Sequence, residues 1–129
     1  KHLMKKNSNL CPKINLLVHS YESFGHIYTS AITSDSSASL EEEVKGCFER
    51  LKLLLKAKEA DLSNVIMTHL YLSNMDTFST VNSIYQGYFK GVNNPPSRCC
   101  VQVKIPSLKR VMIDCIAHKI VDDRSTLLV

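Results

Sequence analysis

A cation, a thiol and a carboxylate lie close together near the end of this 129-residue chain. Arg98 and Cys100 belong to a segment that alternates polar and apolar residues, and Asp114 belongs to a second such segment. A period of two is typical of β-strands. Pro106 lies between the segments and cannot donate a ladder hydrogen bond, so residues 105–109 are predicted to form a turn. The two strands are therefore predicted to pair as a hairpin.

We expect this hairpin to close with Lys104 opposite Arg110, which places Cys100 opposite Asp114. Directly opposed residues share one face of a sheet, and so do residues two apart on a strand. Arg98, Cys100 and Asp114 are then expected to project from the same surface. The grouping depends on the register, since a slip of one residue moves Asp114 to the other face.

Two interpretations of this group remain open. One is a partly buried ion pair that only sets the strand register, because structural ion pairs are common. The other is an anion site, in which the planar fork of Arg98 binds a carboxylate and Asp114 moves a proton or positions a water. A thiol beside an arginine can become reactive, but we expect Cys100 to contribute its backbone instead. By alternation, Cys99 is predicted to point into the packing layer.

The overall composition, with 44% hydrophobic and 22% charged residues, indicates one globular domain. The net charge of +4 is too small for a nucleic-acid-binding surface, and several of the lysines lie in the first 13 residues, so no nucleic-acid partner is expected. No apolar run approaches the ~20 residues of a membrane helix, so no membrane association is expected.

The cysteines and histidines indicate neither disulfides nor a metal site. The five cysteines lack paired spacing, which favours a reducing, cytoplasmic setting. The five histidines are scattered, and each is interpreted as a surface or otherwise satisfied polar residue. No metal and no cofactor are expected.

The remaining elements follow from hydrophobic periodicity and from turn and capping residues. Ser39 with Glu42 predicts the start of a helix that ends near Ala60, and Gly91 predicts the end of a second helix. The predicted strands and helices are 15–19, 26–32, 40–60, 65–72, 78–89, 98–103 and 110–117, with a turn at 21–25. Residues 1–13 are predicted to be a polar leader or linker, 14–121 the domain and 122–129 a tail, and the start suggests a piece of a longer protein.

The predicted order β-β-α-β-α-β-β indicates an α+β fold, with one mixed sheet and two helices on one of its faces. The other face carries apolar residues. Homo-oligomerisation is the simplest way to cover it.

Three motifs in order resemble the reactive intermediate deaminase (RidA, or YjgF) family, some of whose members are called endoribonucleases. The motifs are Phe-x-x-Val-Asn-x-x-Tyr-x-x-Tyr-Phe over 78–89, Pro-x-Arg-x-Cys-Val-x-Val over 96–103 and Val-x-Ile-Asp-x-Ile-Ala over 111–117. The resemblance covers nearly the whole chain from Gly25 onward. It implies a chorismate-mutase-like fold and a homotrimer whose three sheets form a closed barrel, with clefts between subunits.

The resemblance also implies roles for single residues. Arg98 would clamp the carboxylate of a 2-keto or imino acid, the backbone at Cys100 would help to hold it, and Asn82 would lie at the cleft wall. Asp114 would position the water that hydrolyses an enamine or imine to a 2-keto acid and ammonia. Ala31 would lie where the family's backbone faces the ligand.

Two departures from the family pattern bear on function. The family carries Glu where this chain has Asp114, which draws the carboxylate back by one bond of ~1.5 Å, and a misplacement of ~1 Å can cost about a hundredfold in rate. Ala31 stands where the family has Gly, so it adds a methyl group. The interpretation we favour is a divergent, non-catalytic domain that binds a small carboxylate, or a trimerising module of a larger enzyme such as diphthine–ammonia ligase. The alternatives are an enamine/imine deaminase and, less favoured, an endoribonuclease.

Overall fold

The computed structural model describes residues 20–36 and 38–120, and its element order confirms the predicted β-β-α-β-α-β-β fold. Short 3-10 turns at 62–64, 75–77 and 106–108 connect several of the elements. The strands and helices are β1 (Ser20–Ser23), β2 (His26–Thr29), α3 (Leu40–Ala57), β3 (Val65–Leu72), α4 (Phe78–Phe89), β4 (Ser97–Gln102) and β5 (Val111–His118).

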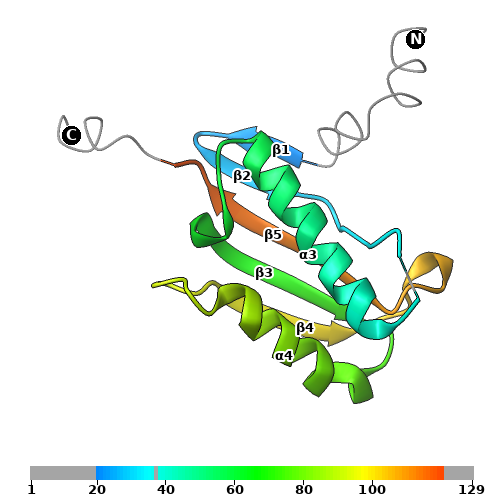
Figure 1. Cartoon of the computed structure of the whole chain (residues 1–129). Helices are drawn as coiled ribbons and strands as arrows, with labels where there is room; N and C mark the ends of the chain where they lie inside the picture. Colours follow the sequence, from blue (N-terminus) through cyan, green and yellow to red (C-terminus); the bar gives the residue numbers. More distant parts are fainter. Residues whose placement is uncertain (1–19, 37, 121–129) are drawn as a thin grey trace, which may run out of the picture.

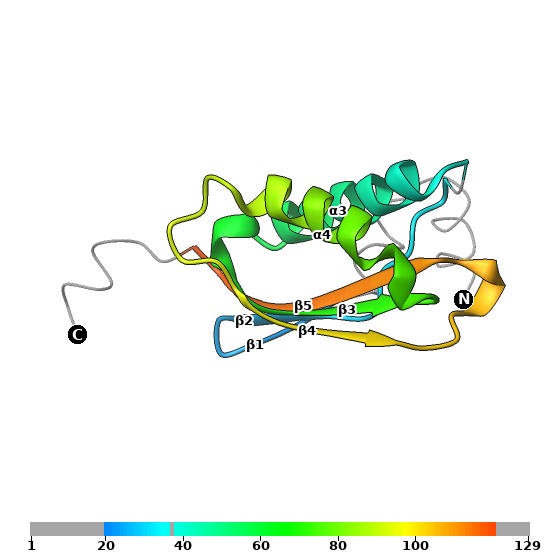
Figure 2. The ribbon, with the colours of Figure 1, turned by 90° about the horizontal axis from the view of Figure 1, so that it is seen from below.

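The molecule has two layers, a five-stranded sheet and a pair of helices (Figures 1 and 2). The strand order is β1-β2-β5-β3-β4, and only β3 and β4 run parallel, joined by α4. Both helices lie on the same side of the sheet (Figure 2), as predicted. We call this side the helix-covered face and the opposite side the bare face. Residues on the bare face of β3 and β5 include His69, Tyr71, Met112 and Asp114, which alternate with buried neighbours.

The predicted pairing of the last two strands is wrong. Both strands exist, but β3 lies between them, pairing in parallel with β4 and antiparallel with β5. The chain leaves β4, passes the end of β3 through the turn at 106–108 and enters β5 two strand positions away. In this turn Ser107 and Leu108 have φ values of 61° and 57°. The alternation therefore predicted the strands correctly but not their neighbours.

The first two strands also differ from the prediction. The segment 21–25 was interpreted as a turn, whereas β1 occupies Ser20–Ser23 and the turn consists of Phe24 and Gly25, with φ of 51° and 78°. The predicted strand at 15–19 lies outside the described residues. β2 is shorter than predicted, and Ile32 rejoins the sheet through a single bridge to Ile113.

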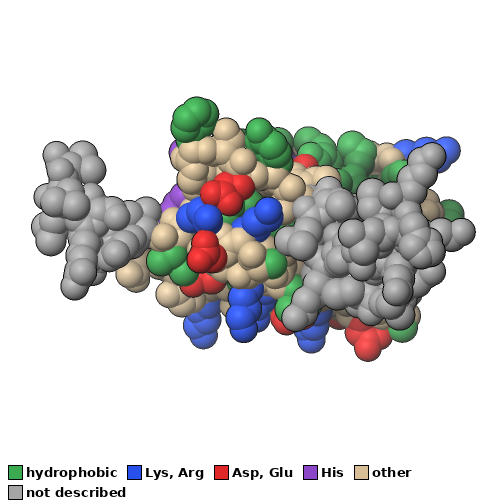
Figure 3. Space-filling view, turned by 90° about the horizontal axis from the view of Figure 1, so that it is seen from above, with side chains coloured by type: hydrophobic (Ala, Val, Ile, Leu, Met, Phe, Trp, Pro, Cys, Tyr) green, Lys and Arg blue, Asp and Glu red, His purple; other side chains and the backbone are tan. Residues whose placement is uncertain are grey.

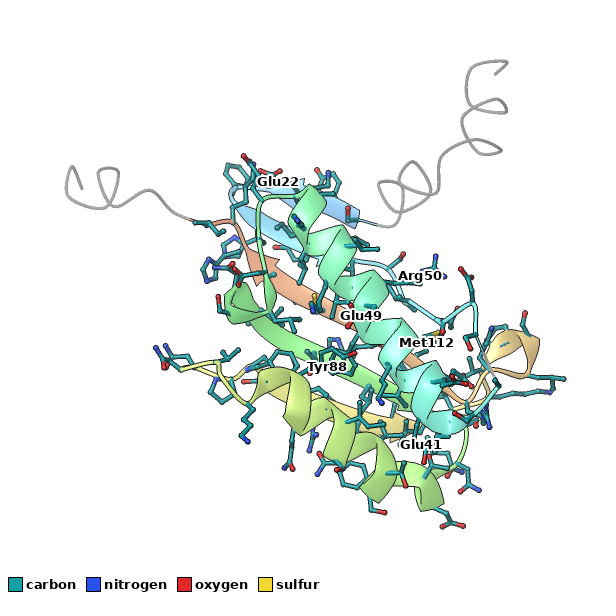
Figure 4. All side chains as sticks on the ribbon, viewed as in Figure 1. Glu22, Glu41, Glu49, Arg50, Tyr88 and Met112 are labelled. Carbon is teal, nitrogen blue, oxygen red and sulfur yellow. The ribbon has the colours of Figure 1, made fainter. Side chains whose placement is uncertain are left out.

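The first helix begins as predicted and ends earlier. The Ser39 side chain accepts a hydrogen bond from the backbone N–H of Glu42, and the helix ends at Ala57 instead of Ala60. Its apolar stripe packs on the sheet and on α4, where Phe48 stacks on Tyr88 with ring centroids 4.5 Å apart. The Tyr88 hydroxyl donates to Glu49 at 2.8 Å, so the helices are also tied at their outer edge (Figure 4). The two helices thus form one unit over the sheet.

A buried carboxylate fixes the start of β5. Glu43, in the first turn of α3, is 0% exposed. Its two oxygens accept hydrogen bonds from the backbone and side chain of Arg110 at 2.7 and 2.8 Å and from the backbone of Val111. A buried charge is tolerated when it is paired and hydrogen-bonded in this way. Glu43 therefore ties the helix layer to the strand that carries Asp114.

Candidate functional site: two clusters on opposite faces of the sheet

The strand register separates the residues that were expected to share a surface. Arg98 lies opposite Thr68, which faces the helices, and Cys99 lies opposite His69, which in turn lies opposite Asp114 on the bare face. Arg98 and Asp114 are thus on opposite faces, with β3 between their strands. The predicted grouping of both residues on one surface was wrong, because it assumed that the two strands pair directly.

On the helix-covered side, Arg98 is held against α4. Its Nη1 donates a hydrogen bond to Oδ1 of Asn82. Its guanidinium carbon lies 4.8 Å from the ring centroid of Tyr85 and 5.4 Å from that of Phe78. A guanidinium within about 6 Å of a ring face is attracted by the ring quadrupole, by about 0.5–1 kcal/mol at exposed sites. The family resemblance implied that Arg98 and Asn82 share one cleft, and these two side chains are in contact.

The ring under Arg98 is itself fixed in the core. Tyr85 is only 6% exposed, and its hydroxyl lies 2.7 Å from Oγ1 of the buried Thr68. Burial raises the pKa of Tyr85, although the hydrogen bond with Thr68 and the charge of Arg98 act in the opposite direction. Arg98, in contrast, is exposed. A rigid, partly stacked cation that remains open to solvent suits the binding of a small anion.

The two adjacent cysteines lie on opposite faces. Cys100 faces the helices, half-buried, and burial raises the pKa of its thiol while the nearby Arg98 lowers it. Burial is the larger effect, so Arg98 does not activate this thiol, and the contribution of the Cys100 backbone to a site stays a prediction. Cys99 was predicted to point into the packing layer, which is wrong. It is exposed on the bare face, because β4 packs against the helices through Arg98 and Cys100.

On the bare face, Asp114 is held by two side chains of β3. Nδ1 of His69 lies 2.6 Å from one carboxylate oxygen, and the Tyr71 hydroxyl donates to the other at 2.8 Å. The Asp114 side chain is 20% exposed and that of His69 is 34% exposed. Burial and the bond to Asp114 raise the pKa of Tyr71 to about 12, so the phenol stays protonated and keeps donating.

His69 is the residue that sequence reasoning missed, since it was grouped with scattered surface histidines. The signal was present in the spacing: His69 and Tyr71 are two residues apart on one strand and share a face, and Asp114 lies between apolar neighbours on another strand. If the apolar sides of both strands pack against the helices, these three side chains must share the opposite face of the sheet. Ala31 is exposed and directly precedes Ile32, which bridges to Ile113 beside Asp114. Ala31 thus lies next to the strand that carries Asp114.

The described part of the chain holds no group of three or more His, Cys, Asp or Glu side chains placed to bind a metal ion. Within the same residues, no helix is both long and apolar enough to span a membrane. Acidic and basic side chains are interspersed on the surface that Figure 3 draws. Lys119 bridges Glu22 and Glu59, each at 3.1 Å.

Comparison with known proteins gives matches over most of this chain. The sequence profile of the family described as Endoribonuclease L-PSP matches residues 16–119. The human 2-iminobutanoate/2-iminopropanoate deaminase is 37% identical over 82 residues, which cover 63% of this chain and 58% of the human protein. The diphthine–ammonia ligase of Schizosaccharomyces pombe is 31% identical over 93 residues, which cover 72% of this chain but only 15% of the ligase.

Solved structures give the same fold. The crystal structure of a YjgF protein family member from Neisseria meningitidis aligns with a TM-score of 0.75 at 20% identity, covering 81% of this chain and 87% of that chain. The mixed sheet with two helices on one face is thus shared. Because the profile spans most of the sequence, the chain belongs to the RidA/YjgF (endoribonuclease L-PSP) family.

Proposed function

We propose that this domain binds the carboxylate of a small 2-keto or 2-imino acid through Arg98. The observation that carries the proposal is the way Arg98 is held, with one hydrogen bond to Asn82 and two aromatic rings of α4 beneath its guanidinium. A cation fixed in this way loses little side-chain entropy when a ligand binds. The backbone of Cys100, two residues along the same strand, is the expected second contact.

We further propose that the complete site forms between copies of the chain, in a homotrimer. Within one chain Asp114 is on the other face of the sheet from Arg98, so one ligand meets both groups only if a second copy supplies one of them. The bare face supports association, since it carries exposed or half-exposed apolar and aromatic side chains, among them Tyr28, Val101 and Met112. Apolar surface of this kind favours contact with a partner.

Imine hydrolysis is the second candidate function, favoured by the deaminase name of the human relative and by a carboxylate retained at position 114. The matched segment spans 58% of that relative's length, so its activity is a proposal for this chain. The match to one segment of a ligase also supports a role as a module of a larger enzyme. Because Asp114 stands where the family has the longer Glu, we favour binding of the acid without turnover.

The test of the clamp is the affinity for 2-ketobutyrate, measured by calorimetry. Replacing Arg98 by alanine removes up to two charge-assisted hydrogen bonds, and we expect about a 30- to 100-fold loss of affinity. Lys90→Ala is the matched control, because it removes an exposed cation at the other end of α4. An unchanged affinity in Arg98→Ala would reject Arg98 as the clamp.

The shared site has its own test if the wild type releases ammonia from an imine made in situ. Arg98→Ala and Asp114→Asn proteins are each expected to be inactive, but unfolding and refolding them together forms mixed assemblies. In a cyclic assembly about a quarter of the sites then receive an intact arginine and an intact aspartate from different copies. Recovery of about that fraction of activity supports a site between copies, and no recovery argues against it.

A further inference from the structure

The imidazole of His69 has a role that neither the family motifs nor the relatives' names assign. It lies on the bare face in the same row as Asp114, and its Nδ1 is 2.6 Å from the carboxylate. Building on the proposed imine hydrolysis, we infer that His69 is the residue that transfers protons in this domain and that Asp114 is its positioning residue. The proton-transfer group would thus be the imidazole at position 69 and not the carboxylate at position 114.

The hydrogen bonds of Asp114 argue against a direct role as base. Each carboxylate oxygen already accepts a short hydrogen bond, one from His69 and one from Tyr71. These two bonds hold both oxygens toward β3, so neither points freely toward a ligand. The side chain is also one bond shorter than glutamate, so the carboxylate stays close to the strand. Asp114 is therefore well held but poorly placed to take a proton from a ligand-bound water.

The same hydrogen bonds fix the tautomer of His69. An ionised carboxylate only accepts, so a neutral imidazole bonded to it carries its proton on Nδ1 and keeps a lone pair on Nε2. The side chain is 34% exposed, so the imidazole is partly open to solvent on the bare face. Imidazole is the side chain that exchanges protons near neutral pH. A base oriented by a third group is the arrangement on which enzymes with an Asp–His pair rely.

The chemistry can be balanced with this single group. Nε2 takes a proton from water as the water oxygen bonds to the iminium carbon, and the C=N π electrons move to nitrogen, which gives a neutral carbinolamine. The imidazolium then protonates the amino nitrogen. The C–N bond breaks as the hydroxyl oxygen forms the C=O bond, and the hydroxyl proton returns to Nε2. Ammonia leaves and takes that proton as ammonium, so iminium and water become 2-keto acid and ammonium.

The experiment compares His69→Gln and Asp114→Asn in the full chain. Both are measured for ammonia release from 2-iminobutanoate made in situ and for the affinity for 2-ketobutyrate. We expect His69→Gln to lower kcat by about a hundredfold or more, with affinity and thermal unfolding nearly unchanged. Added imidazole should restore part of the activity of His69→Ala. A merely structural role would not respond to free imidazole.

Asp114→Asn should also lower kcat strongly, because an amide no longer fixes the imidazole as the carboxylate does. Full activity in His69→Gln together with inactivity in Asp114→Asn would overturn the inference in favour of a carboxylate base. A wild-type chain that binds 2-ketobutyrate but releases no ammonia would also overturn it, while leaving the Arg98 clamp intact.

Discussion

On the helix-covered face Arg98 is held by the aromatic rings of α4, whereas on the bare face Asp114 is held by hydrogen-bonding side chains of β3. The first arrangement depends on the core, because Tyr85 beneath the arginine is itself buried. The second depends on polar groups that remain partly exposed. The proposed clamp thus rests on the folded core while staying exposed itself, and the proposed proton-transfer groups lie on the surface that a partner copy would cover.

The largest expected effect is on the free energy of unfolding, and it compares a core residue with a residue of the bare face. Phe48 is 1% exposed and contacts three aromatic rings of α4, so Phe48→Ala should lower the free energy of unfolding by about 3–5 kcal/mol. Met112, on the bare face, is only half-buried, and Met112→Ala should cost about 1 kcal/mol at low protein concentration. Chemical denaturation at several concentrations measures both.

The same series reports on assembly. If the bare face is covered by a second copy, wild-type stability rises with protein concentration, and Met112→Ala reduces that rise. Equal costs for the two substitutions at every concentration would contradict the distinction between the faces.

The next prediction concerns thiols. Burial raises the pKa of both Cys47 and Cys115 to about 12, so their thiolate fraction at pH 8 is about 10⁻⁴. Cys99 is exposed on the bare face, where iodoacetamide can reach its sulfur, and should react about a hundredfold or more faster than either buried cysteine. Mass spectrometry of digests from a Cys11→Ser background, which removes a thiol outside the described residues, measures each site. Slow labelling of Cys99 even in dilute solution would contradict its placement.

The smallest expected effect separates charge from geometry at the clamp. Arg98→Lys keeps the positive charge but loses the planar group that stacks on Tyr85 and Phe78. We expect affinity for 2-ketobutyrate to fall about tenfold, less than for Arg98→Ala, because about 1.4 kcal/mol of stacking and fork geometry is lost. An affinity equal to that of Arg98→Ala would show that charge alone contributes little.

Local patterns predicted most of the elements and failed on their arrangement. The Ser39 cap and the apolar stripes gave both helices, and the apolar run at 65–72 gave β3 with its observed bounds. Alternation sorts residues into two faces but does not name the neighbouring strand, so β4 and β5 were paired by their closeness in sequence. The mostly apolar composition of residues 65–72 was the available sign that β3 is an interior strand.

The candidate site was predicted only in part, because some of its contacts are local in the sequence and others depend on which strands are neighbours. Arg98 and Asn82 meet because a strand and the helix before it pack locally. The contact of His69 with Asp114 joins residues that are 45 positions apart. It depends on the pairing of β3 with β5, which alternation alone does not predict. The burial of Glu43 against Arg110 depends on the same strand arrangement, so the helix pattern alone does not predict it.

Arg98 lies on β4, which is an edge strand of the sheet, and this position has a thermodynamic consequence. A ligand that touches this strand in one copy and an interior strand of another must favour the assembled state. By reciprocity, the factor by which an acid strengthens association equals the factor by which association strengthens its binding. Dilution would then weaken the affinity for the acid, and a saturating acid would keep dilute copies together.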